Sequence, residues 1–239
     1  MTLPARCGSV GRMAPPGVRS VGTLVTIEGV EGAGKSTQLA RLRASLEAAG
    51  HAVLATSEPD GTPLGRSVRA LLGRLAPLDP VAETLLFAAS RAEHVRRVIA
   101  PALDAGQIVL CDRFADSTVA YQGYGRGVAL DTIAAVNRLA SEGRRPDLTV
   151  ILDLDVAEGL RRARVRRPAA TGTAADPREA DPFERLALEF HERVRKGYWA
   201  IQAREPERVA LVDASRDEAA VAREILALLT TRLVPGRTG

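Results

Sequence analysis

Cysteine is scarce in this sequence, which has only Cys7 and Cys111 among its 239 residues. Two cysteines cannot build the framework of a disulfide-stabilised secreted domain, so a reducing, cytoplasmic location is expected. No stretch approaches the roughly 18 unbroken apolar residues that a membrane-spanning helix needs. Residues 1–22 also lack the apolar core of a secretory signal. We therefore expect neither a membrane protein nor a secreted one.

Acidic residues are missing from residues 1–22, which carry Arg6, Arg12 and Arg19 and thus three of the four net positive charges. Residues 23–239 then have a net charge of +1. The sequence pI near 9.6 is therefore no sign of a nucleic-acid partner. Rich in Gly, Pro and Arg and without periodicity, residues 1–22 are predicted to be a disordered basic extension.

Short apolar runs alternate with longer helical patterns, and no internal repeat is present. The β-rich runs are 24–28, 52–56, 108–112, 148–153 and 209–213. The helical patterns are 36–49, 63–75, 81–105, 131–141, 156–166, 182–204 and 217–233. This alternation predicts one α/β domain over residues 23–234, with a five-stranded parallel sheet flanked by helices and a disordered tail over 235–239. Ligands of such folds bind at the carboxyl ends of the strands.

Local signals mark the ends of several of these helices. Asp79, Asp131 and Asp217 are predicted N-caps, and Gly50 and Gly106 stand where helices would end.

The exception to the compact pattern is the segment 167–181, which is rich in small residues. A long loop inside a compact domain is typical of a mobile cover over a site. We predict a flexible lid at about 161–181.

Residues 29–36 (GVEGAGKS) fit the phosphate-binding pattern G-x-x-x-x-G-K-[S/T], for which composition predicts roughly 0.002 chance matches. An apolar strand precedes the motif and an amphipathic helix follows it, as a P-loop requires. Its backbone N–H groups would surround phosphate oxygens at the positive end of the helix. Lys35 is one of only two lysines against 31 arginines, and as a compact charge it suits the β- and γ-phosphates. Ser36 would bind Mg²⁺. The alternative is a Gly-rich turn with a solvated lysine.

A P-loop alone does not identify the reaction. Regulatory GTPases read guanine with Asn-Lys-x-Asp, but the only asparagine here, Asn137, is followed by Arg138. A nucleotide-binding switch is therefore disfavoured, and kinases of small acceptors remain.

Five further segments occur in order with the P-loop, from about residue 24 to about residue 233. They are 58–62 (EPDGT), 85–91 (LLFAASR), 111–114 (CDRF), 120–127 (AYQGYGRG) and 145–149 (RPDLT). Together they resemble the thymidylate kinases. The resemblance implies a P-loop NTPase fold and an enzyme that transfers the γ-phosphoryl group of ATP to dTMP, forming dTDP and ADP for dTTP synthesis. It also implies Mg²⁺ as cofactor and a homodimer. The alternative is a P-loop kinase for a deoxynucleoside or another monophosphate.

Phe87 and Arg91 are four residues apart and share one helix face, so they could stack on a base and donate to its carbonyl edge. From the residues alone, a core phenylalanine with an arginine reaching solvent is the favoured reading. The resemblance assigns the pair to thymine.

Asp112 and Arg113 close a predicted strand, where an acid can reach the metal of a P-loop. Asp153 and Asp155 are rival metal ligands, and the resemblance favours Asp112. Arg113 would bind the acceptor phosphate with its fork of N–H groups.

The resemblance also implies the remaining site residues. ATP would be bound by Gly29, Val30, Glu31, Gly32, Ala33, Gly34, Lys35, Ser36 and Thr37. The acceptor would be bound by Glu31, Arg69, Phe87, Arg91, Arg113, Ser117, Tyr121 and Gln122. Within this set Arg69 would hold the acceptor phosphate and Glu31 the 3′-hydroxyl of the sugar. Tyr121 would exclude a ribose hydroxyl, and the catalytic residues would be Lys35, Asp112, Arg113 and a lid arginine.

Five arginines and no acid occupy residues 161–167, next to the predicted lid. Like charges so close repel one another, so a bound polyphosphate would relieve the cost, although a solvated helix face is the simpler reading. We expect Arg164 to be the catalytic lid arginine. Two departures from the family pattern are Asp60, where Gly is usual, and Pro182, where the lid often has an arginine.

Overall fold

The computed structural model describes residues 22–75, 77–166 and 188–233. The predicted N-terminal extension up to residue 21, the lid residues 167–181, Pro182 and the tail over 235–239 lie outside the described residues.

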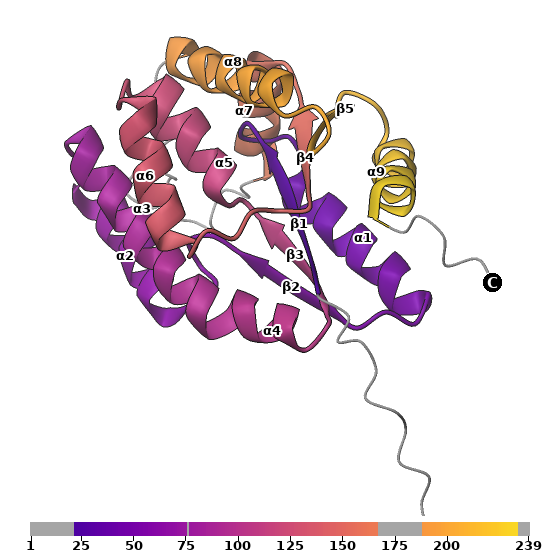
Figure 1. The fold of residues 1–239 in the computed structure, drawn as a ribbon. Helices are drawn as coiled ribbons and strands as arrows, with labels where there is room; N and C mark the ends of the chain where they lie inside the picture. Colours follow the sequence, from indigo (N-terminus) through magenta and orange to yellow (C-terminus); the bar gives the residue numbers. More distant parts are fainter. Residues whose placement is uncertain (1–21, 76, 167–187, 234–239) are drawn as a thin grey trace, which may run out of the picture.

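A five-stranded parallel sheet forms the centre of the molecule (Figure 1), as the sequence predicted. Its strands are β1 (Thr23–Gly29), β2 (Val53–Ser57), β3 (Ile108–Asp112), β4 (Leu148–Asp153) and β5 (Val209–Asp213). They lie in the order β2-β3-β1-β4-β5, and every neighbouring pair is parallel. Residues 24–29 of β1 are buried, because helices cover both faces of the sheet.

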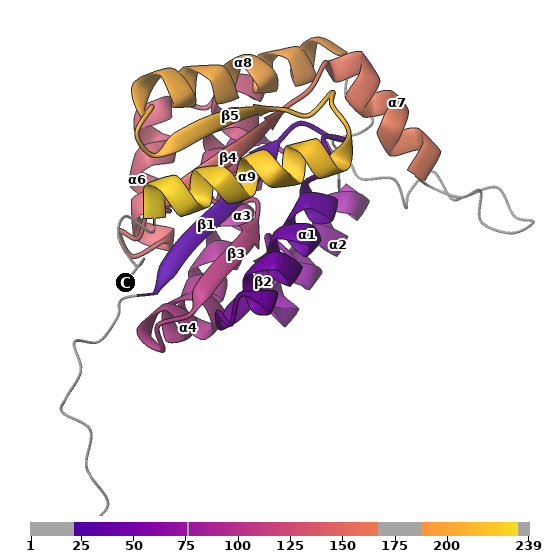
Figure 2. The ribbon, with the colours of Figure 1, turned by 90° about the vertical axis from the view of Figure 1, so that its right-hand side faces the viewer.

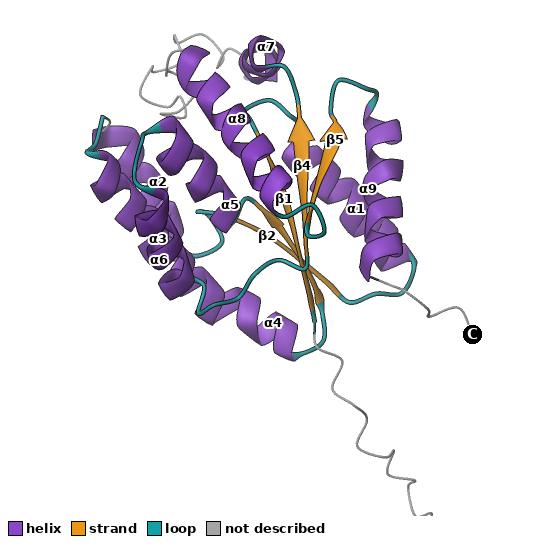
Figure 3. Cartoon of the chain, turned by 45° about the horizontal axis from the view of Figure 1, so that its top comes forward, coloured by secondary structure: helices purple, strands orange, loops and turns teal. Residues whose placement is uncertain are grey.

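Helices form a layer on each face of this sheet (Figure 3). On one face α1 (Lys35–Ala48) and α9 (Glu218–Leu233) contact each other and the strands. On the other face lie α4 (Ala100–Asp104), α5 (Ala115–Thr118) and α8 (Leu188–Arg204). Farther from the sheet, α3 (Pro80–His94) contacts both α2 (Pro63–Leu75) and α6 (Leu130–Ala140). Figure 2 shows α7 (Val156–Arg166) projecting beyond the rest of the described fold.

Two helical segments differ from the sequence expectation. The pattern 81–105 predicted one helix, but a π-helical segment η1 (Val95–Ile99) separates α3 from α4. There the N–H of Ala100 donates to the carbonyl of Val95, just before Pro101, which has no N–H to continue the α-helical pattern. A second π-helix, η2 (Val119–Gly125), follows α5, and neither element was predicted.

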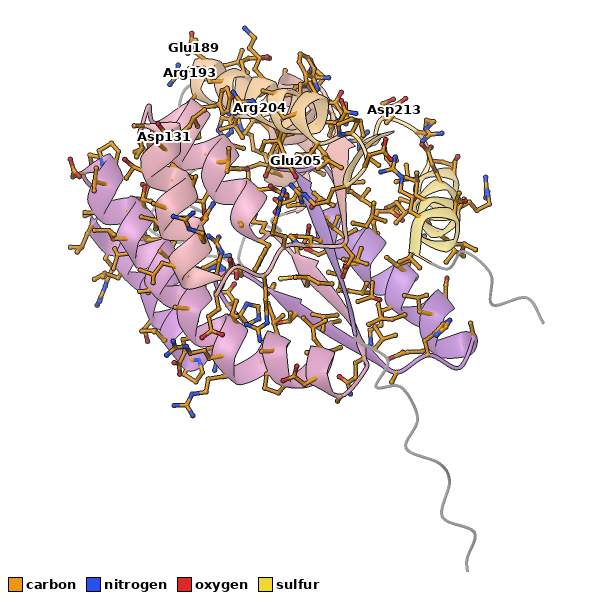
Figure 4. The ribbon with its side chains drawn as sticks, in the orientation of Figure 1. Asp131, Glu189, Arg193, Arg204, Glu205 and Asp213 are labelled. Atoms are coloured by element: carbon orange, nitrogen blue, oxygen red, sulfur yellow. The ribbon has the colours of Figure 1, made fainter. Side chains whose placement is uncertain are left out.

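The predicted caps are confirmed at four of five positions. Asp79 accepts from the N–H groups of Val81 and Ala82, and Asp217 accepts from those of Ala219 and Ala220. Gly50 and Gly106 follow helix ends with φ of +86° and +75°. The prediction for Asp131 was wrong, because Ala129 is the N-cap of α6. Asp131 lies in the first turn (Figure 4), where its negative charge interacts favourably with the positive end of the helix dipole.

None of the helices within the described ranges combines the length and the apolar character needed to cross a lipid bilayer.

Candidate active site

The loop between β1 and α1 has the shape that the glycine pattern predicted. Gly29, Gly32 and Gly34 have φ of +138°, +73° and +91°, conformations that side chains disfavour. Gly34 caps α1 without any side-chain hydrogen bond, which leaves the positive helix end open to an anion. A Cβ on Gly32 would lie 1.9 Å from the carbonyl oxygen of Gly159 in α7. The sequence reasoning did not find Gly159, whose lack of a side chain lets α7 pack on the loop.

Lys35, at the start of α1, is 8% exposed and lies against the P-loop itself. Its Nζ donates to the carbonyls of Gly29 at 3.1 Å and Val30 at 2.9 Å. Burial, and next the charge of Arg113, lower the pKa of this ammonium group. The P-loop thus fixes the position of the lysine that is predicted to bind phosphate there. Val30 and Ala33 bury their side chains in the core, so only their backbone can meet a ligand.

Ser36 and Asp112 meet at the carboxyl end of β3. The Ser36 hydroxyl donates to Oδ2 of Asp112 at 2.8 Å. A hydroxyl and a carboxylate both offer hard oxygen ligands. Mg²⁺ keeps most of its water ligands and binds only one or two protein groups, so this pair fits the ion. The rival Asp153 instead accepts from Arg195 at 2.8 and 2.9 Å and from Trp199 at 3.1 Å. The geometry therefore favours Asp112.

Arg113 follows Asp112 in the left-handed conformation, with φ of +70°. Its Nη2 lies 2.6 Å from Oε1 of Glu31, and its guanidinium lies over the Tyr121 ring at 4.9 Å from the centroid. Burial alone would raise the pKa of Glu31, but Arg113, Lys35 and the Tyr121 hydroxyl outweigh it and lower that pKa to about 2. Glu31 is therefore ionised and holds Arg113 beside the P-loop.

A pocket opens beside this ion pair. Its lining brings together every acceptor residue expected from the sequence: Glu31, Arg69, Phe87, Arg91, Arg113, Ser117, Tyr121 and Gln122. The P-loop, Asp60, Arg69, Asp112 and Arg113 line a second, more open space of about 1100 Å³.

Arg91 is held more tightly than its sequence position indicated, with 2% of its surface exposed. Its Nε donates to Glu58 at 2.8 Å and its Nη1 to Asn137 at 2.6 Å. Its Nη2 donates to the Phe114 carbonyl and the Thr118 hydroxyl. The guanidinium group of Arg91 therefore does not extend into solvent. Glu58 and Asn137, which fix it, were missed, because the elements that carry them are far apart in the sequence.

The residues expected to contact the sugar and the base are also fixed by neighbours. Tyr121 donates its hydroxyl to Glu31 at 2.9 Å, and the Gln122 amide donates to Glu83 at 3.0 Å. The Ser117 hydroxyl donates to Glu28 at 2.5 Å.

The arginine run has a counter-charge that the sequence reasoning overlooked. Arg161 and Arg162 both pair with Glu158, three and four residues upstream, at 2.7 Å. The idea that this run repels itself without an acid is therefore wrong for these two. Arg164 is exposed on the same helix.

A third cavity of about 600 Å³ lies behind the P-loop, lined among others by Thr37, Arg162 and Arg216.

Glu28 is the main site residue that the sequence reasoning missed, although a lone acid in an apolar strand could have revealed it. It is fully buried and accepts from the Phe114 N–H at 2.7 Å, the Ser117 hydroxyl at 2.5 Å and the Tyr198 hydroxyl at 2.9 Å. Burial, and then the charge of Asp116, raise its pKa to about 7. Glu28 ties the strand before the P-loop to the segment that carries Arg113 and to α8.

We expect this carboxyl group to make folding stability depend on pH. Since the folded state prefers the neutral form, stability is fully present below the ordinary pKa of 4.5 and is lost as pH rises through about 7. The whole shift corresponds to about 3 kcal/mol. Urea unfolding of the wild type and of Glu28→Gln, compared at several pH values, isolates this contribution because other groups cancel. The variant should gain on the wild type as pH rises, and a constant difference would contradict the assignment.

Together, the parallel sheet, the P-loop at its carboxyl edge and the adjoining basic cavity define a P-loop phosphotransferase. The family model for thymidylate kinase matches residues 27–225. A thymidylate kinase of Solidesulfovibrio magneticus is 53% identical over 203 residues, covering 84% of this chain and 95% of the relative. That of Deinococcus radiodurans is 47% identical, covering 89% and 98%. The crystal structure of thymidylate kinase from Ehrlichia chaffeensis aligns with a TM-score of 0.68 at 34% identity, covering 87% of this chain and 98% of that one. The chain belongs to the thymidylate kinase family.

Proposed function

We propose that this chain transfers the γ-phosphoryl group of ATP to the 5′-phosphate of dTMP, forming dTDP and ADP for dTTP synthesis. One observation carries the proposal beyond family membership. The cavity lined by Phe87 and the space lined by the P-loop share Glu31, Glu58, Arg69 and Arg113. A nucleoside monophosphate in the first would present its phosphate between two arginines, facing the phosphates held by the second.

The reaction needs no nucleophilic side chain. A 5′-phosphate oxygen of the acceptor attacks the γ-phosphorus in line, and the bond from that phosphorus to the β–γ bridging oxygen breaks, so that ADP leaves. Lys35 and Arg113 hold the two phosphate groups in line and neutralise the charge that develops. Ser36 and Asp112 would hold Mg²⁺, which supplies charge neutralisation on the ATP oxygens. Removal of divalent ions with EDTA should therefore stop turnover.

Base recognition follows from the fixed position of Arg91. Four of the five N–H groups of its guanidinium donate to protein acceptors, which leaves one N–H on Nη1 for a base carbonyl. The arginine cannot turn to suit another base, because its other bonds are buried. Phe87, one helical turn earlier in the same cavity, offers its ring for stacking. Tyr121 and Glu31 would meet the sugar, the first against a ribose hydroxyl and the second with the 3′-hydroxyl.

The acceptor preference tests this assignment. We expect dTMP to be preferred over dCMP by at least about 10²-fold in kcat/KM, since the exocyclic amine of cytosine cannot accept from Arg91. A coupled assay of ADP release over a panel of monophosphates and nucleosides measures it. Equal rates with CMP or UMP would move the chain to another class of small-acceptor kinase, and ADP release independent of any acceptor would indicate a nucleotide-binding switch.

We further propose a homodimer in the cytoplasm. The neighbouring helices α2, α3 and α6 expose large apolar side chains that a second copy could cover: Leu64, Leu75, Val81, Leu85 and Leu139. Leu139 alone is 82% exposed. Large apolar side chains exposed on neighbouring helices fit a surface that a second subunit covers. Sedimentation of the purified chain as a monomer at micromolar concentration would contradict the homodimer, and recovery in the membrane fraction would contradict the cytoplasmic location.

A further inference from the structure

Asp60, in the loop between β2 and α2, carries a carboxylate that lies on Arg69. Its two oxygens are 2.8 and 2.9 Å from Nε of that arginine. The loop is held in place by the N–H of Gly61, which donates to the carbonyl of Ser57, and by Arg66, which donates to the carbonyl of Asp60 at 3.1 Å. The acid is thus presented to Arg69 by a loop with its own hydrogen bonds.

The position of this ion pair matters because Arg69 lines both the acceptor cavity and the P-loop space, whereas Asp60 lines only the latter. An acceptor phosphate reaching across the boundary must come to the guanidinium of Arg69. The guanidinium of Arg69 is already paired with the carboxylate of Asp60, so the phosphate would lie beside a second negative charge.

The two arginines of this boundary differ in freedom. Arg113 pairs with Glu31, and their side chains are 18% and 14% exposed. Arg69 and Asp60 are 44% and 37% exposed. An exposed pair is weak, and its long side chains separate readily. The pair of Arg69 with Asp60 is therefore the one that an incoming phosphate can exchange.

We propose that Asp60 is an internal competitor of the acceptor phosphate: its carboxylate occupies Arg69 in the empty site and must yield when the monophosphate binds. The inference rests on the proposed function, because it takes Arg69 as a ligand of the acceptor phosphate. Asp60 thereby weakens binding of the phosphate end of the acceptor and leaves the base end untouched.

Competition for one cation has a quantitative consequence. Removing the charge of Asp60 should raise the affinity of every anion that binds Arg69 by the same factor, whether that anion is dTMP or inorganic phosphate. It should leave thymidine, which has no phosphate, unchanged. For a half-exposed ion pair we expect a factor of about 3 to 10.

The test is equilibrium binding of dTMP and thymidine, and of inorganic phosphate through its competition with dTMP, to the full chain and to Asp60→Asn, without ATP. Asparagine keeps the size of the side chain and removes its charge. Glu47→Gln is the matched control, because Glu47 pairs with Arg43 at 2.8 Å in an equally exposed ion pair at the far end of α1. We expect Kd for dTMP and for phosphate to fall together in Asp60→Asn and to stay constant in Glu47→Gln. An unchanged or weaker dTMP affinity in Asp60→Asn would overturn the proposal, since Asp60 would then merely orient Arg69.

A double-mutant cycle separates competition from simple repulsion. In an Arg69→Ala background the cation for which Asp60 and the phosphate compete is gone, so Asp60→Asn should give no more than a small part of its gain in dTMP affinity. A full gain in that background would show that Asp60 acts on the phosphate directly, and the proposal would fail. Failure of the proposed function is distinguishable, because the wild type would then not bind dTMP at all. An unfolding curve verifies that each variant is folded, so a changed thymidine affinity of folded Asp60→Asn would also contradict the proposal.

Discussion

Replacement of Lys35 by alanine should lower kcat by at least about 10³-fold while the protein stays folded. The ammonium group lies in the P-loop, where it donates to the carbonyls of Gly29 and Val30. Those contacts are hydrogen bonds to backbone carbonyls of a loop that lines the open space, and they are not side-chain packing in the core. Alanine therefore removes the charge that would neutralise the transferring group, at little cost to folding.

Two variants sharpen this test, with steady-state kinetics and an unfolding curve for each. Lys35→Arg keeps the charge and should also be severely impaired, because the planar guanidinium does not fit a loop closed around a compact ammonium group. Lys196→Ala is the matched control, since Lys196 is the only other lysine and is exposed on α8. Near-wild-type turnover of a folded Lys35→Ala protein would remove the assignment of the P-loop as the phosphate site.

Neutralising Arg164 is the second large effect that we expect, with kcat lowered by about 10²- to 10⁵-fold, as for arginines that act on a transferring phosphoryl group. The affinity for dTMP should change little, because such a contact forms mainly in the transition state. Among the described residues, Arg161 and Arg162 pair with Glu158, whereas Arg164 does not. This difference singles out Arg164 on the described part of α7.

The measurement is alanine substitution of Arg164, with steady-state kinetics in both substrates. Arg161→Ala serves as the control on the same helix, since it removes an equally exposed charge and should alter only the salt dependence. If Arg164→Ala keeps wild-type kcat, the catalytic arginine is not Arg164, and the described part of this run is a solvated helix face.

The strands could be predicted almost to the residue, because a parallel sheet buried on both faces requires continuous apolar runs. The P-loop was predictable for a different reason: its glycines and its lysine are adjacent in sequence, so a local pattern specifies the whole structure. The two π-helices were not predictable in this way. Their period matches neither the helical nor the strand pattern, and η2 carries Tyr121 and Gln122 into the cavity.

Contacts between distant residues account for the rest. Spacing placed Phe87 and Arg91 on one helix face, but it could not show that Glu58 and Asn137, 33 and 46 residues away, engage Arg91. The same limit hid the pairing of Asp60 with Arg69, nine residues apart in a loop and a helix. Asp131 failed as a cap for a local reason, since the N-cap of the helix is Ala129, two residues earlier than the sequence signal indicated.

The three donors to Glu28 set the moment at which the site can first exist during synthesis. Phe114 lies 86 residues beyond Glu28 and Tyr198 lies 170 residues beyond it. When the ribosome has released β3, the P-loop is complete, but the central strand β1 still lacks β4, and its carboxyl group still lacks the Tyr198 hydroxyl from α8. A domain generally folds as a unit during synthesis. The glutamate therefore stays hydrated and ionised in the nascent chain and becomes buried only after α8 emerges, so unfinished chains carry the phosphate loop without an assembled acceptor site.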